Sequence, residues 1–336
     1  MGKVQKNKKS IIKLSVSAVI LIAAIWLIFV ISCPNRLKET KTVSIEQGLS
    51  TRSIADVLKN EKVFSSRLFF LLKVNLSQYR GQLKYGEFEF TPEDGYDEVI
   101  KKIATGGAKK ETVSVTVPEG YSAEKIIELL VQKGLGSEAD FKNAMNDSYD
   151  YEFLKKINPP KECKYRLQGF LFPSTYDFYA DAKPHDIIDK MLSEFDREYK
   201  TLNAPYDNLF ETIIKASLIE RESKTDSDRA KIAGVIENRL NIGMKLQIDA
   251  TVVYAISDGM YDVNRVYYKD LECDSPYNTY KYNGLPIGPI ASPGLKSIEA
   301  ALNPEKHDYL YYRTDSTKND GSHVFSKDFE EHKAAK

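Results

Sequence analysis

The first strong pattern along the chain is a long apolar run near its N-terminus. The run covers Leu14–Cys33 without a charged residue, and lysines precede it at positions 3, 6, 8, 9 and 13. A helix needs about 20 apolar residues to cross the ~30 Å hydrocarbon core of a bilayer. We therefore predict a cytoplasmic tail over 1–13 and a single transmembrane anchor over 14–33, with the following residues outside the cell membrane.

Two other interpretations of this run stay open. A cleaved signal peptide usually has a shorter apolar region, of about 7–15 residues. Val30–Cys33 also loosely resembles a lipoprotein cleavage box, in which Cys33 would carry the lipid. The length of the run and the following Pro34 favour a retained anchor, which keeps the functional part tethered outside the membrane.

After a short linker over 34–42, a weak repeat occurs at an offset of 72 residues. The segment from Val43 to Leu58 aligns with the segment from Val115 to Leu130, and each has a glycine and a serine at matching positions. This is the pattern of a strand, a glycine turn, a serine N-cap and an amphipathic helix. We interpret 43–150 as a region of small βαβ-like modules that serve for binding or spacing.

The pattern changes at about residue 151. Helical periods occur in four segments, 185–199, 205–223, 226–240 and 296–302. Shorter alternations predict a strand around Leu246–Val253 and a closing hairpin from 309–314 and 323–326. Helices and short strands without a regular βαβ rhythm predict an α+β domain over 151–336.

One of these helices carries an acidic residue on its apolar side. In the segment Asp207–Ser223, Leu209, Ile213 and Ala216 form one stripe, and Glu220 continues the same line. A carboxyl group on an apolar stripe is partly desolvated, which favours its protonated form near neutral pH. Such a group can protonate a glycosidic oxygen, so Glu220 is the candidate catalytic acid.

The alternative is that Glu220 ends the helix in a buried ion pair with an arginine such as Arg239. Glu222 lies about 200° away on the helical wheel, on the polar face. The helical period therefore distinguishes Glu220 from Glu222, but it does not decide between catalysis and an ion pair.

Composition narrows the classes of function. Basic and acidic residues number 48 each, so the net charge is zero and no nucleic-acid partner is indicated.

The cysteines and histidines lack metal-site spacing, and we expect no cofactor. Cys163 and Cys273 could pair or remain free thiols. Gly284–Gly294 lacks the lysine of a phosphate-binding loop and is interpreted as a rigid shaping loop.

A set of motifs resembles one known family. Ala216–Glu222 is similar to the catalytic motif of the endolytic murein transglycosylases (the MltG or YceG-like proteins). Further stretches match in the same order: Val235–Leu240, Gly243–Val252, Tyr277–Tyr280, Gly284–Ile290, Ser292–Gly294 and Gly321–Phe325. The resemblance covers the whole chain and is dense over Leu167–His332. It implies a LysM-like region over 43–150 and a YceG-like catalytic domain over 151–336.

Three positions depart from the family pattern. Gln168 stands where a glutamate is usual, and Ala250 and Ile287 stand where prolines are usual. Gln168 puts in doubt any role for a second carboxylate at that position.

The resemblance implies a lytic transglycosylase that cleaves peptidoglycan glycan strands with Glu220 as acid and then base. The products would carry 1,6-anhydro-N-acetylmuramic acid (anhydroMurNAc) ends, and the reaction would limit strand length beside peptidoglycan synthases. On the predicted strand, Gln247, Asp249 and Thr251 alternate and would point the same way. The candidate substrate-binding residues are these three together with Asn278, Tyr280, Glu222 and Arg239.

Two rival functions remain. A membrane-tethered glycan-binding scaffold would suit the anchor and the N-terminal modules equally well. A muramidase that uses water would need a second carboxylate, for which Asp249 is the candidate.

Overall fold

The computed structural model describes residues 37–335, except 47, 107–111 and 264. The chain divides into two compact units, Met1–Glu111 and Thr112–Lys336. The predicted tail and anchor over 1–33 lie outside the described residues. Within the described part of the chain, no helix is long and apolar enough to cross a membrane.

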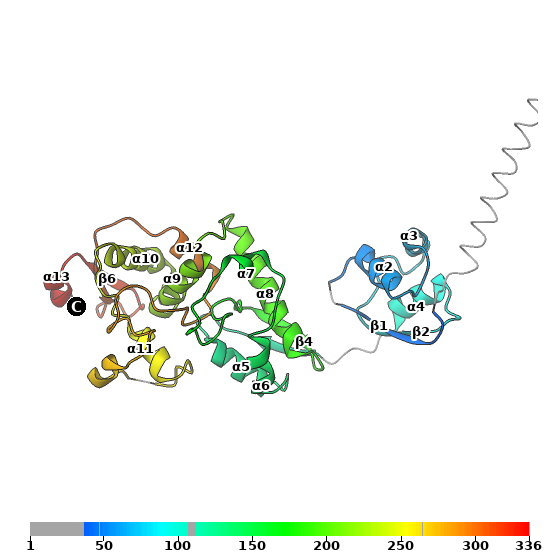
Figure 1. Ribbon diagram of the computed structural model, residues 1–336. Coiled ribbons are helices and arrows are strands. Elements are labelled where there is room, and N and C mark those ends of the chain that lie inside the picture. Colours follow the sequence, from blue (N-terminus) through cyan, green and yellow to red (C-terminus); the bar gives the residue numbers. More distant parts are fainter. Residues whose placement is uncertain (1–36, 47, 107–111, 264, 336) are drawn as a thin grey trace, which may run out of the picture. The chain divides into compact units, whose positions relative to one another are not determined.

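The first unit is a two-stranded antiparallel sheet covered by three helices (Figure 1). Its elements are β1 (Lys41–Ile45), α2 (Thr51–Asn60), α3 (Arg67–Leu76), β2 (Gly86–Phe90) and α4 (Tyr96–Thr105). Val43 pairs with Phe88, and both side chains are buried because alternate residues of each strand face the helices. Ser50 begins α2 by accepting a hydrogen bond from the backbone N–H of Ser53.

The second unit opens with the same succession of strand, helices, strand and helix. Its elements are β3 (Thr112–Thr116), α5 (Ala123–Gln132), α6 (Glu138–Ala144), α7 (Glu152–Lys156), β4 (Thr175–Tyr179) and α8 (Pro184–Thr201). Ser122 caps α5 as Ser50 caps α2, so the predicted strand and capped helix occur in both copies. Because β3 pairs with β4 across the predicted boundary at 150/151, that boundary falls inside the second unit.

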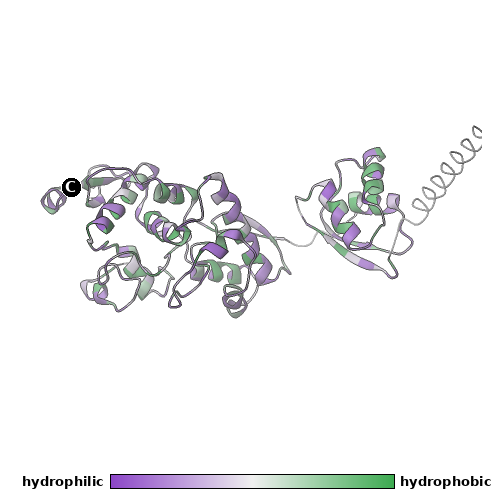
Figure 2. Cartoon of the chain, turned by 45° about the horizontal axis from the view of Figure 1, so that its top comes forward, coloured by the Kyte–Doolittle hydropathy of each residue, from purple (hydrophilic) through white to green (hydrophobic). Residues whose placement is uncertain are grey.

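The rest of the second unit is mainly helical. It contains α9 (Leu209–Glu222), α10 (Asp226–Asn241), α11 (Asp249–Ile256), the 3-10 helix η1 (Tyr268–Glu272), α12 (Leu295–Leu302), β5 (Tyr311–Thr314), β6 (His323–Ser326) and α13 (Phe329–Ala334). Figure 2 shows hydrophobic and hydrophilic residues along each of the longer helices, as expected for helices with one buried side. Helices with small antiparallel sheets confirm the predicted α+β class.

The predicted strand at Leu246–Val253 is wrong. Leu246 and Ile248 are buried and Gln247 is exposed, but this alternation covers only the approach to α11. The helix begins at Asp249, whose carboxylate lies in the first turn, where the helix dipole favours a negative charge.

Helix α9 belongs to two hydrophobic cores of the second unit. Its first half contributes Ile213 and Ala216 to a core shared with α5 and α8. Its second half contributes Leu218 and Ile219 to a core shared with α10 and α11. The last turn of α9, which carries Glu220, is therefore fixed by packing on both sides.

Two glycines allow this packing to be tested. Gly169 has φ +86°, and a Cβ atom there would lie 2.7 Å from both Ile213 Cγ2 and Pro289 Cβ. Gly284 has φ +88°, but nothing lies within 4 Å of its added Cβ. We expect Gly169→Ala to lower the free energy of unfolding by about 3 kcal/mol, from backbone strain plus overpacking. Gly284→Ala should cost about 1 kcal/mol, from strain alone.

The measurement is urea unfolding followed by circular dichroism. If both variants lost the same free energy of unfolding, Gly169 would not be tightly packed between Ile213 of α9 and Pro289.

Candidate active site

The predicted acid lies where the helical period places it. Glu220 is in the last turn of α9, following the buried Leu209, Ile213 and Ala216. Its side chain is only 7% exposed. A carboxyl group this enclosed needs polar partners, because an unpaired buried charge is costly.

Two groups from neighbouring helices contact the Glu220 carboxylate. The backbone N–H of Gly294 donates a hydrogen bond to Oε2 at 3.0 Å. Gly294 is the N-cap of α12, so the positive end of that helix faces the carboxylate. Arg229 Nη1, on α10, lies 3.5 Å from Oε1 and also donates to Ser297 Oγ at 3.1 Å. Both contacts stabilise a negative charge on Glu220.

Arg239, which the sequence suggested as an ion-pair partner of Glu220, is not the arginine that contacts it. Arg239 does not reach Glu220; its guanidinium donates to the carbonyls of Leu310 and Leu246, each at 2.6 Å. Arg239 therefore joins the residue before β5 to the segment before α11, and Arg229 forms the contact with Glu220 instead.

A second link ties α9 to the loop that the sequence predicts to be a rigid shaping loop. Ser217 Oγ accepts a hydrogen bond from Ile290 N at 3.1 Å and donates to Ile214 O at 2.7 Å. Ser217 and Glu220, one turn apart, thus hold the backbone amides of residues 290 and 294. The loop carries Gly294 to the carboxylate for this reason.

Three of the predicted substrate-binding residues gather beside the C-terminal hairpin. The hydroxyl of Tyr280 donates to Asp249 Oδ1. The hydroxyl of Tyr312, on β5, donates to Glu222 Oε2 at 2.9 Å. Burial raises the pKa of Glu222 to about 7, with a smaller upward contribution from Asp249, against the Tyr312 hydrogen bond and Arg221, which lower it. Glu222 lies on the polar face of the helical wheel, as the sequence predicts, but there Tyr312 of the hairpin covers it.

The other predicted binding residues have structural contacts. Thr251 is buried, with Oγ1 2.9 Å from Thr279 Oγ1. Asn278 is buried, and its amide donates to the carbonyls of Leu271 and Cys273. Gln247 is exposed at φ +51°. The expectation that Gln247, Asp249 and Thr251 point one way is wrong, because they lie on a turn and a helix.

The structure provides two hollows near these residues. One, of about 320 Å³, is lined by Asp249, Tyr280, Arg265, Tyr267 and Tyr268 among others. Tyrosine rings with a carboxylate suit the apolar faces and hydroxyls of sugars. The other, of about 380 Å³, lies beside the Glu220 partner Arg229 and includes Lys296 and Glu299.

Sequence reasoning did not assign a site role to four residues around Glu220. Glu119 and Arg229 were not singled out, whereas Arg221 and Gly294 appeared only as members of the motifs Ala216–Glu222 and Ser292–Gly294. A Cβ atom added to Gly294 would lie 1.8 Å from Glu119 Oε1, so this second carboxylate rests against the residue that binds Glu220. One signal was present: Glu119 occupies the repeat position at which the first copy has Gln47.

Gln168 and the cysteines are also placed. Gln168 is buried and its Oε1 accepts from Ala123 N at 2.9 Å, so it holds the first turn of α5. Cys163 and Cys273 are free thiols, in agreement with the second of the two alternatives left open for them.

Comparison with known proteins identifies the family. The family model described as the YceG-like family matches residues 43–336. The chain belongs to this family. An endolytic murein transglycosylase of Bacillus subtilis is 36% identical over 314 residues, which cover 89% of this chain and 84% of that protein.

Two further YceG-like relatives agree. An endolytic murein transglycosylase of Streptococcus pneumoniae is 30% identical over 88% of this chain, but the match spans only 57% of that longer protein. The 2.6 Å crystal structure of a yceG-like protein from Listeria monocytogenes superposes with a TM-score of 0.57. That protein is 34% identical, and the match covers 89% of this chain and 99% of that one. This YceG-like chain therefore shares its fold with a solved member of the family.

The raised pKa of Glu222 predicts a pH dependence of stability. The folded state holds the proton of Glu222 more tightly than the unfolded state, whose pKa is near 4.5. The stabilisation is therefore complete below about pH 4.5 and is lost as the pH rises through 7. Glu222→Gln, which keeps an acceptor for Tyr312, should remove this loss and gain about 3 kcal/mol over the wild type at pH 8.

The comparison is the free energy of unfolding at pH 4.5 and pH 8, with Glu211→Gln, exposed on the same helix, as the matched control. The same wild-type-to-Glu222→Gln difference at both pH values would contradict the buried, protonated state of Glu222.

Proposed function

We propose that this protein cleaves the glycan strands of peptidoglycan by lytic transglycosylation, with Glu220 as the catalytic residue. The observation that carries the proposal is one enclosed carboxyl group, 7% exposed, held between Gly294 N–H and Arg229. It lies in the motif Ala216–Glu222 of a family whose curated relatives are named endolytic murein transglycosylases.

The reaction needs one group that gives and then takes a proton. Glu220 in its acid form protonates the oxygen that joins C1 of N-acetylmuramic acid to the next sugar, and the C1–O bond breaks. The 6-hydroxyl of the same muramic acid then attacks C1, and the Glu220 carboxylate takes its proton. The products are a 1,6-anhydroMurNAc end and a free 4-hydroxyl on the leaving sugar, and no water is consumed.

The contacts of Glu220 favour its carboxylate form, which acts in the second step of the reaction. After it gives up the proton, the carboxylate faces the Gly294 N–H, the N-terminus of α12 and Arg229. These groups are in place before the reaction and do not need to reorganise, which is the usual source of electrostatic catalysis.

The remaining parts fit delivery of a strand to this site. The hollow lined by Asp249, Tyr280 and Tyr268 would hold sugars of the strand. The first unit would act as a LysM-like glycan-binding module, and an anchor over 14–33 would keep the enzyme at the outer side of the cell membrane. There it would limit the length of strands made by peptidoglycan synthases.

One observation favours a second candidate, hydrolysis by a water molecule. A second carboxylate, Glu119, lies beside Glu220, and hydrolytic glycosidases usually use two such groups. The two reactions leave different ends, because hydrolysis produces a reducing end.

The function is tested by digesting purified peptidoglycan, and nascent uncrosslinked strands, with the full chain in detergent. We expect anhydroMurNAc ends by mass spectrometry from the wild type. The rate should fall at least about 1,000-fold in Glu220→Gln, because the amide cannot exchange the proton. Glu211→Gln removes an exposed charge from the same helix and should cut normally. Wild-type protein that cuts neither substrate would instead favour the glycan-binding scaffold.

The sugar-binding hollow predicts a separate effect. Tyr268 is 92% exposed, and loss of its ring removes a stacking surface worth about 1 kcal/mol. We expect Tyr268→Ala to raise KM about fivefold with little change in kcat. Tyr282→Ala, an exposed tyrosine that does not line the hollow, is the control. A fall in kcat at unchanged KM would remove Tyr268 from substrate binding.

A further inference from the structure

Two carboxylates converge on Gly294. Its N–H binds Glu220 Oε2, and the side of the same residue is occupied by Glu119 Oε1. Gly120, the next residue after Glu119, also lies close to Glu220, since a Cβ added there would be 3.8 Å from Glu220 Cγ. Two acids at one glycine are unusual, because like charges at close range repel each other.

The loop that carries Glu119 is held by the same parts that hold Glu220. Gly120 N donates to Ser292 O at 2.9 Å, and Ser292 N donates to Tyr121 O at 2.7 Å. Arg221, the neighbour of Glu220 on α9, donates to Gly120 O at 3.3 Å and lies over the ring of Tyr261. The backbone at Gly120 and Tyr121 is therefore held next to the last turn of α9 and to Ser292, which places the Glu119 side chain beside Gly294.

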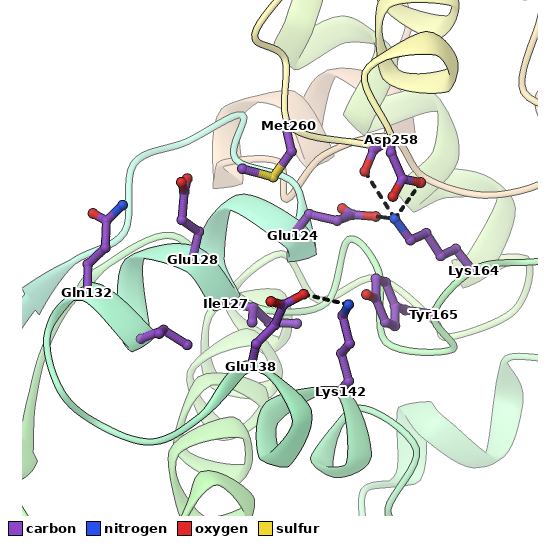
Figure 3. Close-up of a pocket in the computed structure, with 11 residues that line it drawn as sticks. Glu124, Ile127, Glu128, Gln132, Glu138, Lys142, Lys164, Tyr165, Asp258 and Met260 are labelled. Carbon is purple, nitrogen blue, oxygen red and sulfur yellow. Dashed lines mark hydrogen bonds and ion pairs between the residues drawn. The ribbon is translucent and has the colours of Figure 1, made fainter.

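The first turn of α5, immediately after this loop, is anchored on its other side. Ser122 Oγ donates to Gly259 O at 2.6 Å. Figure 3 shows Lys164 reaching between Glu124 and Asp258, with Nζ–O distances of 2.9 and 2.7 Å, at the edge of a cavity of about 310 Å³. These contacts fix α5 against the segment after α11, and so hold the Glu119 loop at the active site.

Charged groups from three helices face Glu119. They are Glu220 on α9, Arg229 and Asp226 on α10, and Lys296 on α12. Lys296 and Arg229 both contact Asp226, so Asp226 partly neutralises the two positive charges that face Glu119. Burial raises the pKa of Glu119, the charge of Glu220 raises it further, and Arg229 and Lys296 only partly oppose this.

We propose that Glu119 is a positioning residue that acts through Glu220, by disfavouring two negative charges at Gly294 so that the carboxyl pair keeps one proton. The inference rests on the proposed function, because that proton is the one given to the glycosidic oxygen. Gly294, the α12 terminus and Arg229 stabilise the Glu220 carboxylate needed in the second step, whereas Glu119 favours the acid needed in the first. The first step needs the protonated acid and the second needs the carboxylate, and different neighbouring groups favour each form.

Removal of the Glu119 charge is expected to shift the pH dependence of activity. Without the Glu119 charge, the repulsion that keeps one proton on the carboxyl pair is lost, so the protonated enzyme is depleted at a lower pH. The high-pH limb of the kcat/KM profile should move down by about half a pH unit in Glu119→Gln, the size expected for two charges a few ångströms apart near water. Glu119→Asp keeps the charge, so its high-pH limb should lie close to that of the wild type. High salt should shrink the difference between wild type and Glu119→Gln, because Glu119 is partly exposed.

The pair can also be observed without substrate. In carbon-13 NMR of glutamate-labelled full chain, the resonance lost in Glu119→Gln identifies Glu119, and its titration midpoint should fall by about half a unit in Glu220→Gln. Glu128→Gln, exposed on α5, is the control and should move neither the midpoint nor the pH profile. Because this titration needs no turnover, it tests the pair even if the wild type released no anhydroMurNAc ends.

Two results would overturn the proposal. One is a Glu119 midpoint unchanged in Glu220→Gln together with a Glu119→Gln profile that superposes on the wild type. The other is complete loss of cleavage at every pH in a correctly folded Glu119→Gln, which would make Glu119 a catalytic base.

Discussion

The site depends on one hydrogen bond, from the backbone N–H of Gly294 to the carboxylate of Glu220. It joins the last turn of α9 to the N-cap of α12, and the Glu220 side chain thereby satisfies a backbone N–H at the start of that helix. The end of the Glu119 side chain lies against this glycine, in the space that a Cβ atom would occupy, so a larger residue at 294 would displace Glu119. Position 294 thus brings together a helix terminus, an enclosed acid and a second carboxylate.

The packing around α9 explains why this hydrogen bond can be held in place. Ile213 and Ala216 lie in one core and Leu218 and Ile219 in the other, so the helix cannot shift toward either without opening a gap. Gly169 sits against Ile213 and the loop that leads to Gly294. A reacting group is most useful when such packing fixes its geometry beforehand, and the two cores of the second unit provide this at Glu220.

Features set by local helical spacing could be predicted from the sequence, and features set by contacts between distant segments could not. The stripe on α9 located Glu220 because helical spacing is a local property. The alternation at Leu246–Ile248 was extended into a strand, although the chain turns into a helix at Asp249. The helical wheel placed Glu222 on the polar face, and its burial could not be predicted because the hairpin that covers it is 90 residues away in sequence. Arg229 and Glu119 reach Glu220 only through folding, and the repeat that sets Glu119 against Gln47 did not show that Glu119 lies beside Glu220.

The account is tested most directly by digesting peptidoglycan with the full chain in water enriched in oxygen-18. Intramolecular attack by the muramic acid 6-hydroxyl uses no water, so we predict anhydroMurNAc ends that carry no label. Reducing ends with one oxygen-18 atom each would contradict transglycosylation and would assign the enclosed acid Glu220 and its neighbour Glu119 to hydrolysis instead.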